Sequence, residues 1–126
     1  MGQGFLMDTN VIIDVLDNTL PPNGLAFVAN LPPVISEVTR MEILGWPNAT
    51  PAQLAPVQAF INRTTLLPIN ELVILKVIEV RQTKKIKLGD AIIAATALVH
   101  NLGLITRNTS DFTNINGLTV IDPHGL

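Results

Sequence analysis

The chain has 126 residues, of which 48% are hydrophobic and only 14% are charged, against about 25% charged residues in an average globular domain. These values exclude a disordered chain and predict a single domain over residues 1–126 whose core needs no metal or disulfide. Ten acidic and eight basic residues give a net charge of −2, which neither indicates nor excludes a nucleic-acid partner. Because the chain has no cysteine, thiol catalysis, disulfides and Cys-rich zinc sites are excluded.

The N-terminal apolar run is short, because Phe5, Leu6 and Met7 are followed directly by Asp8. A secretory signal needs a hydrophobic region of about 7–15 residues, so no export signal is predicted. The most apolar stretch, residues 91–99, is also much shorter than the roughly 20 residues that span a bilayer. We therefore expect a cytoplasmic protein with no membrane contact.

In the first half of the chain, short strands are predicted to alternate with short helices. A buried strand at residues 5–7 precedes apolar residues with helical spacing at 11–16. After a Pro-Pro-Asn-Gly break, a short helix is predicted at residues 25–29 and a second strand at 34–35. Ser36 is the expected N-cap of a helix that continues to about Leu44.

The second half of the chain repeats this alternation of strands and helices. We expect helices at residues 51–62, 70–83 and 89–101, and strands at 65–69, 104–106 and 118–121. The helix at 89–101 is apolar nearly all round, so it should be central. Strands separated by helices predict an α/β fold with a mostly parallel sheet of four to five strands, covered on both faces. In such a sheet, ligands bind beyond the carboxyl ends of the strands.

Three aspartates lie where a ligand site of this sheet is expected. Asp8 follows the first strand, Asp90 opens the apolar helix, and Asp111 lies just beyond the strand at 104–106. Asp8 and Asp90 have a second interpretation as helix caps, because a carboxylate near a helix N-terminus accepts backbone N–H bonds. Asn10 could cap the first helix instead and leave Asp8 free, and Asp111 could be a turn residue in a polar loop.

Glu42 is a fourth candidate, on the helix that follows Ser36. At about 100° per residue it lies roughly 40° round from Val38 and flanks an expected apolar stripe of Val38 and Met41. This position predicts an inward carboxylate, although a solvated side chain is the alternative. An inward carboxylate needs a neutralising cation or metal, because burying an unpaired charge costs several kcal/mol.

Together the four carboxylates indicate a site for a hard cation. Carboxylate oxygens without cysteine or paired histidine are typical ligands of Mg²⁺ or Mn²⁺ rather than zinc. Such an ion can orient a phosphodiester, activate a water and stabilise the leaving oxygen. The residues therefore favour phosphoryl-transfer or nuclease chemistry.

Half of the basic residues lie in the seven-residue segment 81–87, shortly before Asp90. They are Arg81, Lys84, Lys85 and Lys87. One interpretation is a solvated helix end that interacts with its own dipole. The other is a patch that attracts RNA phosphates beside an acidic site, to which Arg107 could contribute from the other side.

Four motifs, in this order, resemble those of PIN-domain ribonucleases, and within that group the VapC-type toxins of toxin–antitoxin pairs. They are residues 6–12 (LMDTNVI), 35–44 (ISEVTRMEIL), 88–97 (LGDAIIAATA), and 105–108 (ITRN) with Asp111-Phe112. Each motif is weak alone, but their order and their spread over nearly the whole chain make the resemblance specific.

The resemblance implies a three-layer α/β/α sandwich and a Mg²⁺- or Mn²⁺-dependent endoribonuclease. It implies metal ligands at Asp8, Glu42 and Asp90, and the matching motifs make Thr9, Asn10, Thr106 and Asn108 supporting residues. The chain departs from some members at Asn108, where they carry an acid. Either Asp111 supplies the fourth carboxylate, or three acids act with Asn108 as a neutral ligand through water.

The resemblance also implies an RNA substrate, a cognate antitoxin protein that covers the acidic cleft, and a homodimer. Retention of Asp8, Glu42 and Asp90 favours the active toxin. The alternative is a regulatory or RNA-binding module that keeps the PIN fold without significant cleavage.

Overall fold

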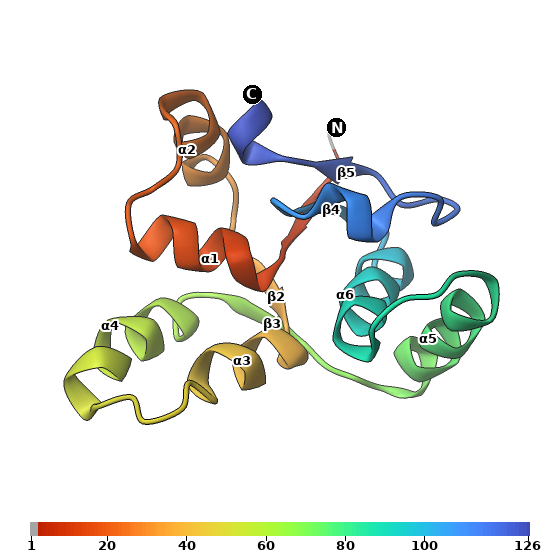
Figure 1. The fold of residues 1–126 in the computed structure, drawn as a ribbon, viewed down its shortest axis with the longest axis horizontal. Coiled ribbons are helices and arrows are strands. Elements are labelled where there is room, and N and C mark those ends of the chain that lie inside the picture. The colour runs from red at the N-terminus through yellow and green to blue at the C-terminus, as the bar shows by residue number, and fades with distance from the viewer. Residues whose placement is uncertain (1–2) are drawn as a thin grey trace.

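The computed structural model describes residues 3–126 (Figure 1). Its strands are β1 (Phe5–Met7), β2 (Val34–Ser36), β3 (Thr65–Leu67), β4 (Gly103–Ile105) and β5 (Val120–Ile121). Its α-helices are α1 (Thr9–Leu16), α2 (Pro22–Ala29), α3 (Glu37–Leu44), α4 (Pro51–Ile61), α5 (Glu71–Thr83) and α6 (Leu88–Val99). Two 3-10 turns, η1 (Thr109–Phe112) and η2 (Pro123–Gly125), lie near the C-terminus. Within these described residues, no helix is long and apolar enough to cross a membrane.

The five strands form two parallel sheets. One has the order β1-β4-β5, with Leu6 opposite Leu104 and Ile105 opposite Ile121. The other consists of β2 and β3, with Ile35 opposite Leu66. The prediction of parallel strands separated by helices is confirmed. The strands lie together as expected, and β1 lies beside β2, but the two ladders of hydrogen bonds are separate in the described part of the chain.

Helices cover both faces of the β1-β4-β5 sheet, because successive residues of its strands point to opposite sides. Leu6 and Leu104 pack with Ile93 of α6 in one apolar cluster. Met7 and Ile105 pack in another cluster with residues of α1, α2 and α4. Figure 1 shows α5 and α6 on one side of the strands and α1, α2 and α4 on the other. The result is the expected three-layer arrangement.

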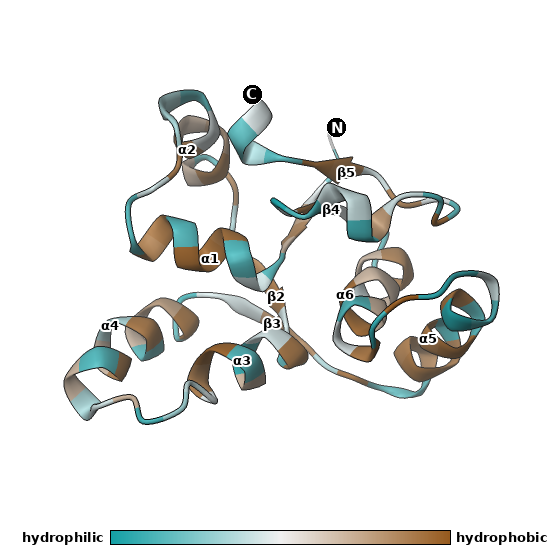
Figure 2. Ribbon diagram, in the orientation of Figure 1, coloured by the Kyte–Doolittle hydropathy of each residue, from teal (hydrophilic) through white to brown (hydrophobic). Residues whose placement is uncertain are grey.

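The central position predicted for the helix at 89–101 is confirmed in α6. Ala91 and residues 93–97 are buried, and α6 packs against the sheet and against α5. Val73, Val77 and Val80 form the buried face of α5, as their spacing predicts. The opposite face of α5 is also apolar and exposed, and appears brown in Figure 2.

Polar residues start the helices at the carboxyl ends of two strands. Ser36 ends β2 and accepts a hydrogen bond from the backbone N of Val38, so the prediction of an N-cap is confirmed. Asp8 follows β1 and is the N-cap of α1. Because β1 and β4 are parallel neighbours, Asp8 and Thr106, which follow them, are brought to the same edge of their sheet.

Candidate active site

Asp8 is almost completely buried at the end of β1, with 5% of its surface exposed. Its Oδ1 accepts a hydrogen bond of 2.7 Å from the backbone N of Thr9. Its Oδ2 accepts hydrogen bonds from the Thr106 hydroxyl (2.8 Å) and from Asn10 Nδ2 (3.1 Å). Asp8 is therefore both the cap and a fixed buried carboxylate. The idea that Asn10 caps α1 in place of Asp8 is wrong, because Asn10 lies inside the helix.

The surroundings of Asp8 raise the pKa of its carboxyl group. Burial is the main cause, and the negative charge of Glu42 acts in the same direction. The hydrogen bonds from Thr106, Thr9 and Asn10 lower the pKa but do not offset the burial. Three hydrogen-bond donors thus orient the Asp8 carboxylate, but they do not fully stabilise its negative charge. A bound cation would supply the missing stabilisation.

Glu42 is exposed at the rim of the site, so the prediction of an inward carboxylate is wrong. The apolar stripe predicted for α3 is also wrong in part: Val38, Thr39 and Ile43 are buried, whereas Met41 is 57% exposed. Helical periodicity gives the angles between residues but not the side that the neighbouring elements cover. The packing of α3 on α4 and α6 turns Met41 outward.

Glu42 nevertheless faces the other acids. Its Oε1 accepts a hydrogen bond of 2.8 Å from the hydroxyl of Thr9, next to Asp8. Its Oε2 lies 3.5 Å from where a Cβ would stand on Gly89. A residue larger than alanine at Gly89 would therefore crowd the space between Glu42 and the first turn of α6.

Asp90 lies in that first turn of α6 and is partly buried. Burial raises the pKa of its carboxyl group, and the charges of Asp8 and then Asp111 raise it further. Lys87 has the opposite, smaller effect. The charges of Asp8 and Asp111 therefore both act on Asp90, although the three residues are far apart in the sequence.

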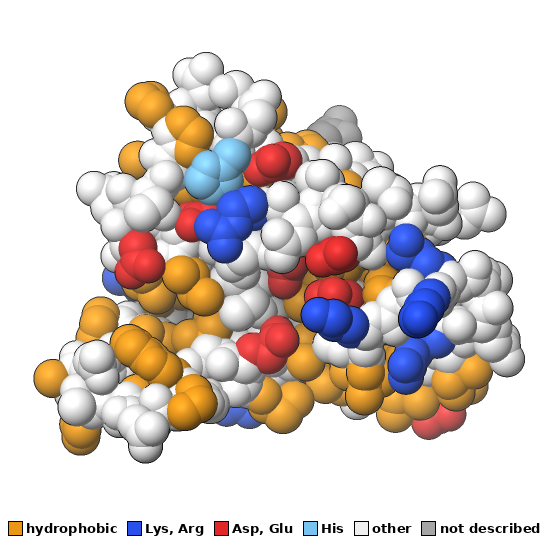
Figure 3. Space-filling model, in the orientation of Figure 1, with side chains coloured by type: hydrophobic (Ala, Val, Ile, Leu, Met, Phe, Trp, Pro, Cys, Tyr) orange, Lys and Arg blue, Asp and Glu red, His pale blue; other side chains and the backbone are white. Residues whose placement is uncertain are grey.

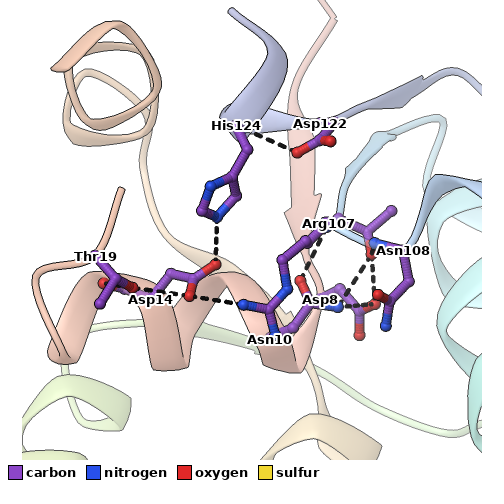
Figure 4. Close-up of polar contacts among 9 residues, drawn as sticks. Asp8, Asn10, Asp14, Thr19, Arg107, Asn108, Asp122 and His124 are labelled. Carbon is purple, nitrogen blue, oxygen red and sulfur yellow. Dashed lines mark hydrogen bonds and ion pairs between the residues drawn. The ribbon is translucent and has the colours of Figure 1, made fainter. Parts of the chain in front are cut away.

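Residues 106–111 contribute to the site mainly through the backbone and through Thr106. Thr106 is fully buried, and its hydroxyl accepts hydrogen bonds from Asn10 Nδ2 (3.2 Å) and from the backbone N of Asn108 (3.1 Å). The backbone N of Asp111 donates to the Asn108 carbonyl at 3.1 Å. Asp111 is therefore a turn residue, as one interpretation held, and also a neighbour of Asp90. Figure 4 shows Asn10 and Asn108 on either side of Asp8.

The acidic residues provide only oxygen donors, as a hard cation prefers. Among residues 3–126, no three carboxylate or imidazole side chains are close enough to hold one ion in this conformation. The donors fit a magnesium-type cation in chemistry and charge, because the pKa values of Asp8 and Asp90 are both raised, first by burial and then by neighbouring carboxylates. Binding would require small movements of exposed side chains such as Glu42.

The basic cluster before α6 lies directly beside these acids. Arg81, Lys84, Lys85 and Lys87 line a cavity of about 490 Å³ together with Asp90, Ser110 and Asp111. Figure 3 shows a group of acidic side chains near the centre of this face and basic side chains beside it on the right. Arg107 is not part of this lining; its guanidinium binds Asp14 instead, at 3.1 Å.

Asp14, a buried carboxylate on α1 that is 3% exposed, was not among the residues expected from the sequence. It pairs with Arg107 and with His124, whose Nε2 lies 2.8 Å from Asp14 Oδ2. The one sequence signal was its position four residues after Asn10, which places both on one face of α1.

Comparisons with known proteins match this arrangement. A family model described as PIN domain matches residues 5–118. A chain of a toxin–antitoxin complex from Klebsiella pneumoniae is 34% identical, with a TM-score of 0.76 over 95% of this chain and 97% of that one. A chain of the DNA-bound VapBC from Salmonella typhimurium is 26% identical, with a TM-score of 0.81 over 97% and 99%.

A third structure, VapBC-1 from nontypeable Haemophilus influenzae, is 28% identical, with a TM-score of 0.78 over 94% and 97% of the two chains. A comparison with curated protein sequences gave no match. The region matched by the family model contains all four acidic residues. From these motifs, this site and this match, the chain belongs to the PIN domain family and shares the fold of chains from VapBC toxin–antitoxin complexes.

Proposed function

We propose that this protein is a Mg²⁺- or Mn²⁺-dependent endoribonuclease and the toxin of a toxin–antitoxin pair. The observation that carries the proposal is the group of carboxylates formed by Asp8 after β1, Asp90 in the first turn of α6 and Asp111 after β4. In this group Asp8 and Asp90 have raised pKa values and Asp111 adds a third negative charge. Such a cluster costs folding energy and is best explained by a bound cation.

Asp8, Glu42 and Asp90 are the proposed ligands, and Asp111 is the candidate for a fourth carboxylate. When bound, the cation would orient the phosphodiester, polarise the attacking water and stabilise the leaving oxygen. Thr106 and Asn10 hold the Asp8 carboxylate in one orientation through hydrogen bonds of 2.8 and 3.1 Å. Fixed orientation of this kind reduces the reorganisation needed during the reaction.

The RNA strand is proposed to approach over the turn between α5 and α6. Lys84, Lys85 and Lys87 line the same cavity as Asp90 and Asp111, so they can neutralise phosphates beside the scissile bond. Arg107 lies outside this cavity. The proposed RNA-binding surface therefore lies on one side of the acidic site, the side of the turn between α5 and α6.

A cognate antitoxin is proposed to cover the site. The structural neighbours from Klebsiella, Salmonella and Haemophilus come from complexes of this kind. In this chain a mostly apolar groove of about 590 Å³ is lined by Ile13, Trp46 and Val57 together with Thr9 and Glu42. An amphipathic segment of the antitoxin in this groove would end at the acidic residues.

A homodimer is proposed through the exposed face of α5. Leu72, Leu75 and Ile78 are 63%, 54% and 49% exposed, and Leu88 nearby is 53% exposed. A contiguous apolar surface of this kind usually marks an interface. Light scattering at micromolar concentration should give the mass of a dimer for the parent and of a monomer for Leu75→Glu. A monomeric parent would contradict this.

The test of the proposed activity is RNA cleavage by the purified chain, with Mg²⁺, with Mn²⁺ and with a chelator. We expect cleavage that depends on the added ion, and its loss in Asp8→Asn. Sequencing RNA 5′ ends after brief induction would identify the target. RNA binding without cleavage by the parent would support the regulatory or RNA-binding module instead.

A further inference from the structure

Arg107 is attached to α1 by two hydrogen bonds whose acceptors lie about one helical turn apart. Its backbone N donates a hydrogen bond of 3.0 Å to Asn10 Oδ1. Its guanidinium Nη1 donates a hydrogen bond of 3.1 Å to Asp14 Oδ1. Asn10 and Asp14 are four residues apart, so they lie on the same face of the helix. Figure 4 shows Arg107 lying along this face.

Asp14 is a firm anchor for the guanidinium because its carboxylate is bound on both oxygens. Oδ1 also accepts a hydrogen bond of 2.9 Å from the hydroxyl of Thr19, and Oδ2 pairs with His124 Nε2 at 2.8 Å. His124 is held in turn by the C-terminal turn, where its backbone N donates to Asp122 Oδ1 at 2.8 Å. The turn packs tightly on α2, since a Cβ on Gly24 would overlap the carbonyl oxygen of Pro123.

The segment that Arg107 fastens carries part of the proposed active site. Thr106, immediately before it, donates a hydrogen bond to Asp8 Oδ2 at 2.8 Å, and Asn10 donates to the same oxygen at 3.1 Å. Asn108, immediately after it, starts the turn that leads to Asp111. The two-point attachment of Arg107 therefore fixes the relative position of α1 and of the segment that follows β4.

We infer that Arg107 and Asp14 are positioning residues that hold Thr106 and Asn10 against Asp8, with His124 supporting Asp14 from the C-terminal turn. Arg107 lies outside the cavity that Asp90 and Asp111 line, and Asp14 is buried on α1. Without the guanidinium, residues 106–108 lose one of their three hydrogen bonds to α1, and Asp14 is left buried with less positive charge. The inference rests on the proposed function in its use of RNA cleavage and cation binding as readouts, whereas exchange of the Arg107 amide is independent of it.

This role differs measurably from the RNA-binding role that the sequence suggested for Arg107. A phosphate ligand contributes to RNA affinity, so its removal raises KM and flattens the salt dependence. A positioning residue acts on the geometry of Asp8, so its removal lowers kcat and cation affinity while KM stays near the parent value. The negative charge of Asp14 would weaken RNA binding. Only the positioning role therefore predicts that neutralising Asp14 lowers kcat and cation affinity.

The experiment compares Arg107→Ala, Asp14→Asn and the double variant with the parent and with Thr19→Val. The last variant removes another hydrogen bond to the same Asp14 oxygen and leaves Arg107 in place. We measure kcat and KM for RNA cleavage below the melting temperature, Mn²⁺ affinity by calorimetry without RNA, and hydrogen exchange of the Arg107 amide without metal.

We expect about 10- to 100-fold lower kcat and Mn²⁺ affinity in Arg107→Ala and Asp14→Asn. The double variant should lose no more kcat or Mn²⁺ affinity than the more impaired single variant, because the two substitutions break the same interaction. The Arg107 amide should exchange faster in Asp14→Asn, and Thr19→Val should match the parent in kcat and cation affinity.

Two results would overturn the inference. One is a raised KM with unchanged kcat in Arg107→Ala and parental behaviour in Asp14→Asn, which would make Arg107 an RNA ligand. The other is a loss of kcat that follows the melting temperature in all variants, Thr19→Val included, which would make the network merely structural. If the parent does not cleave RNA, the proposed function fails, and Mn²⁺ affinity and amide exchange still test the positioning role.

Discussion

Asp8 and Asp14 are both buried carboxylates near one helix, yet their pKa values move in opposite directions. For both, burial is the largest effect and raises the pKa. At Asp14 the hydrogen bonds from His124 and Thr19 and the charge of Arg107 outweigh it, so the pKa is lowered. At Asp8 the hydrogen bonds come from neutral groups and Glu42 adds a negative charge, so the pKa stays raised. The carboxylate of Asp14 stabilises the fold, whereas the ionised form of Asp8 is disfavoured and costs stability.

This contrast predicts opposite pH dependences for two substitutions in the metal-free protein. The lowered pKa of Asp14 gives stability that is present above the ordinary value of 3.8 and lost as pH falls through the lowered value. Asp14→Asn should therefore be less stable than the parent by about 2 kcal/mol at neutral pH, with a smaller difference in acid. Urea unfolding from pH 3 to 7 measures this, and a constant difference would contradict it.

Asp90 should behave in the opposite way. Its raised pKa means that stability is present below 3.8 and lost as pH rises through the raised value. Asp90→Asn, which does not titrate, should equal or exceed the parent in melting temperature at pH 7 without metal. It should also lose cleavage by at least about 100-fold, the usual effect of removing a group that stabilises transition-state charge.

The matched control for Asp90→Asn is Asp17→Asn, the same chemical change at an exposed position on the C-cap of α1. It should keep the parental cleavage rate. Cleavage by Asp90→Asn at the parental rate would remove Asp90 from the site.

At the scale of elements, the site depends on where α5 ends and α6 begins. The turn at residues 84–87 is short, so its lysines are held within one cavity with the first turn of α6. The same turn places Gly89 beside Glu42, and it places Asp90 close enough to Asp8 for the charge of Asp8 to raise the pKa of Asp90. One connection thus brings a basic surface and an acidic site side by side.

Lys85→Ala is expected to weaken RNA binding and to reduce its salt dependence. Removing one phosphate interaction with a single strand makes the slope of log affinity against log salt shallower by about 0.7. Arg63→Ala is the control, because it removes the same charge from the end of α4, where Arg63 lies over the Phe60 ring. Fluorescence titrations at several salt concentrations measure both slopes, and equal slopes for the two variants would place the RNA path elsewhere.

At the scale of the whole molecule, the acidic site opens between two bodies of packed helices. The apolar cluster around α1, α2 and α4 and the cluster around α6 meet at the sheet, and the carboxylates lie where the strands end. The apolar groove is lined in part by Glu42 and by Thr9, which directly follows Asp8. A partner that binds along the groove can therefore reach the site directly.

The antitoxin is expected to insert an arginine among the carboxylates, because a guanidinium binds carboxylates bidentately and stays charged at any working pH. Affinity for the antitoxin should then fall as Mg²⁺ rises at constant ionic strength. Asp8→Ala and Asp90→Ala should each weaken the complex, and Arg81→Ala should not. Calorimetry on the purified pair tests this, and an affinity that ignores Mg²⁺ and both acids would place the inhibitory contact elsewhere.

The sequence by itself determined the order of the elements, the central position of α6 and the four acidic candidates, because these follow from local periodicity, capping and turn chemistry. The tertiary structure decided the separation of the two sheets, the exposure of Glu42 and Met41, and the neighbours of Asp14. A helical pattern fixes which residues share a face, but not which face other elements cover. The pairs of Asp14 with Arg107 and His124 join residues 93 and 110 positions apart, and such contacts exist only once the strands have assembled.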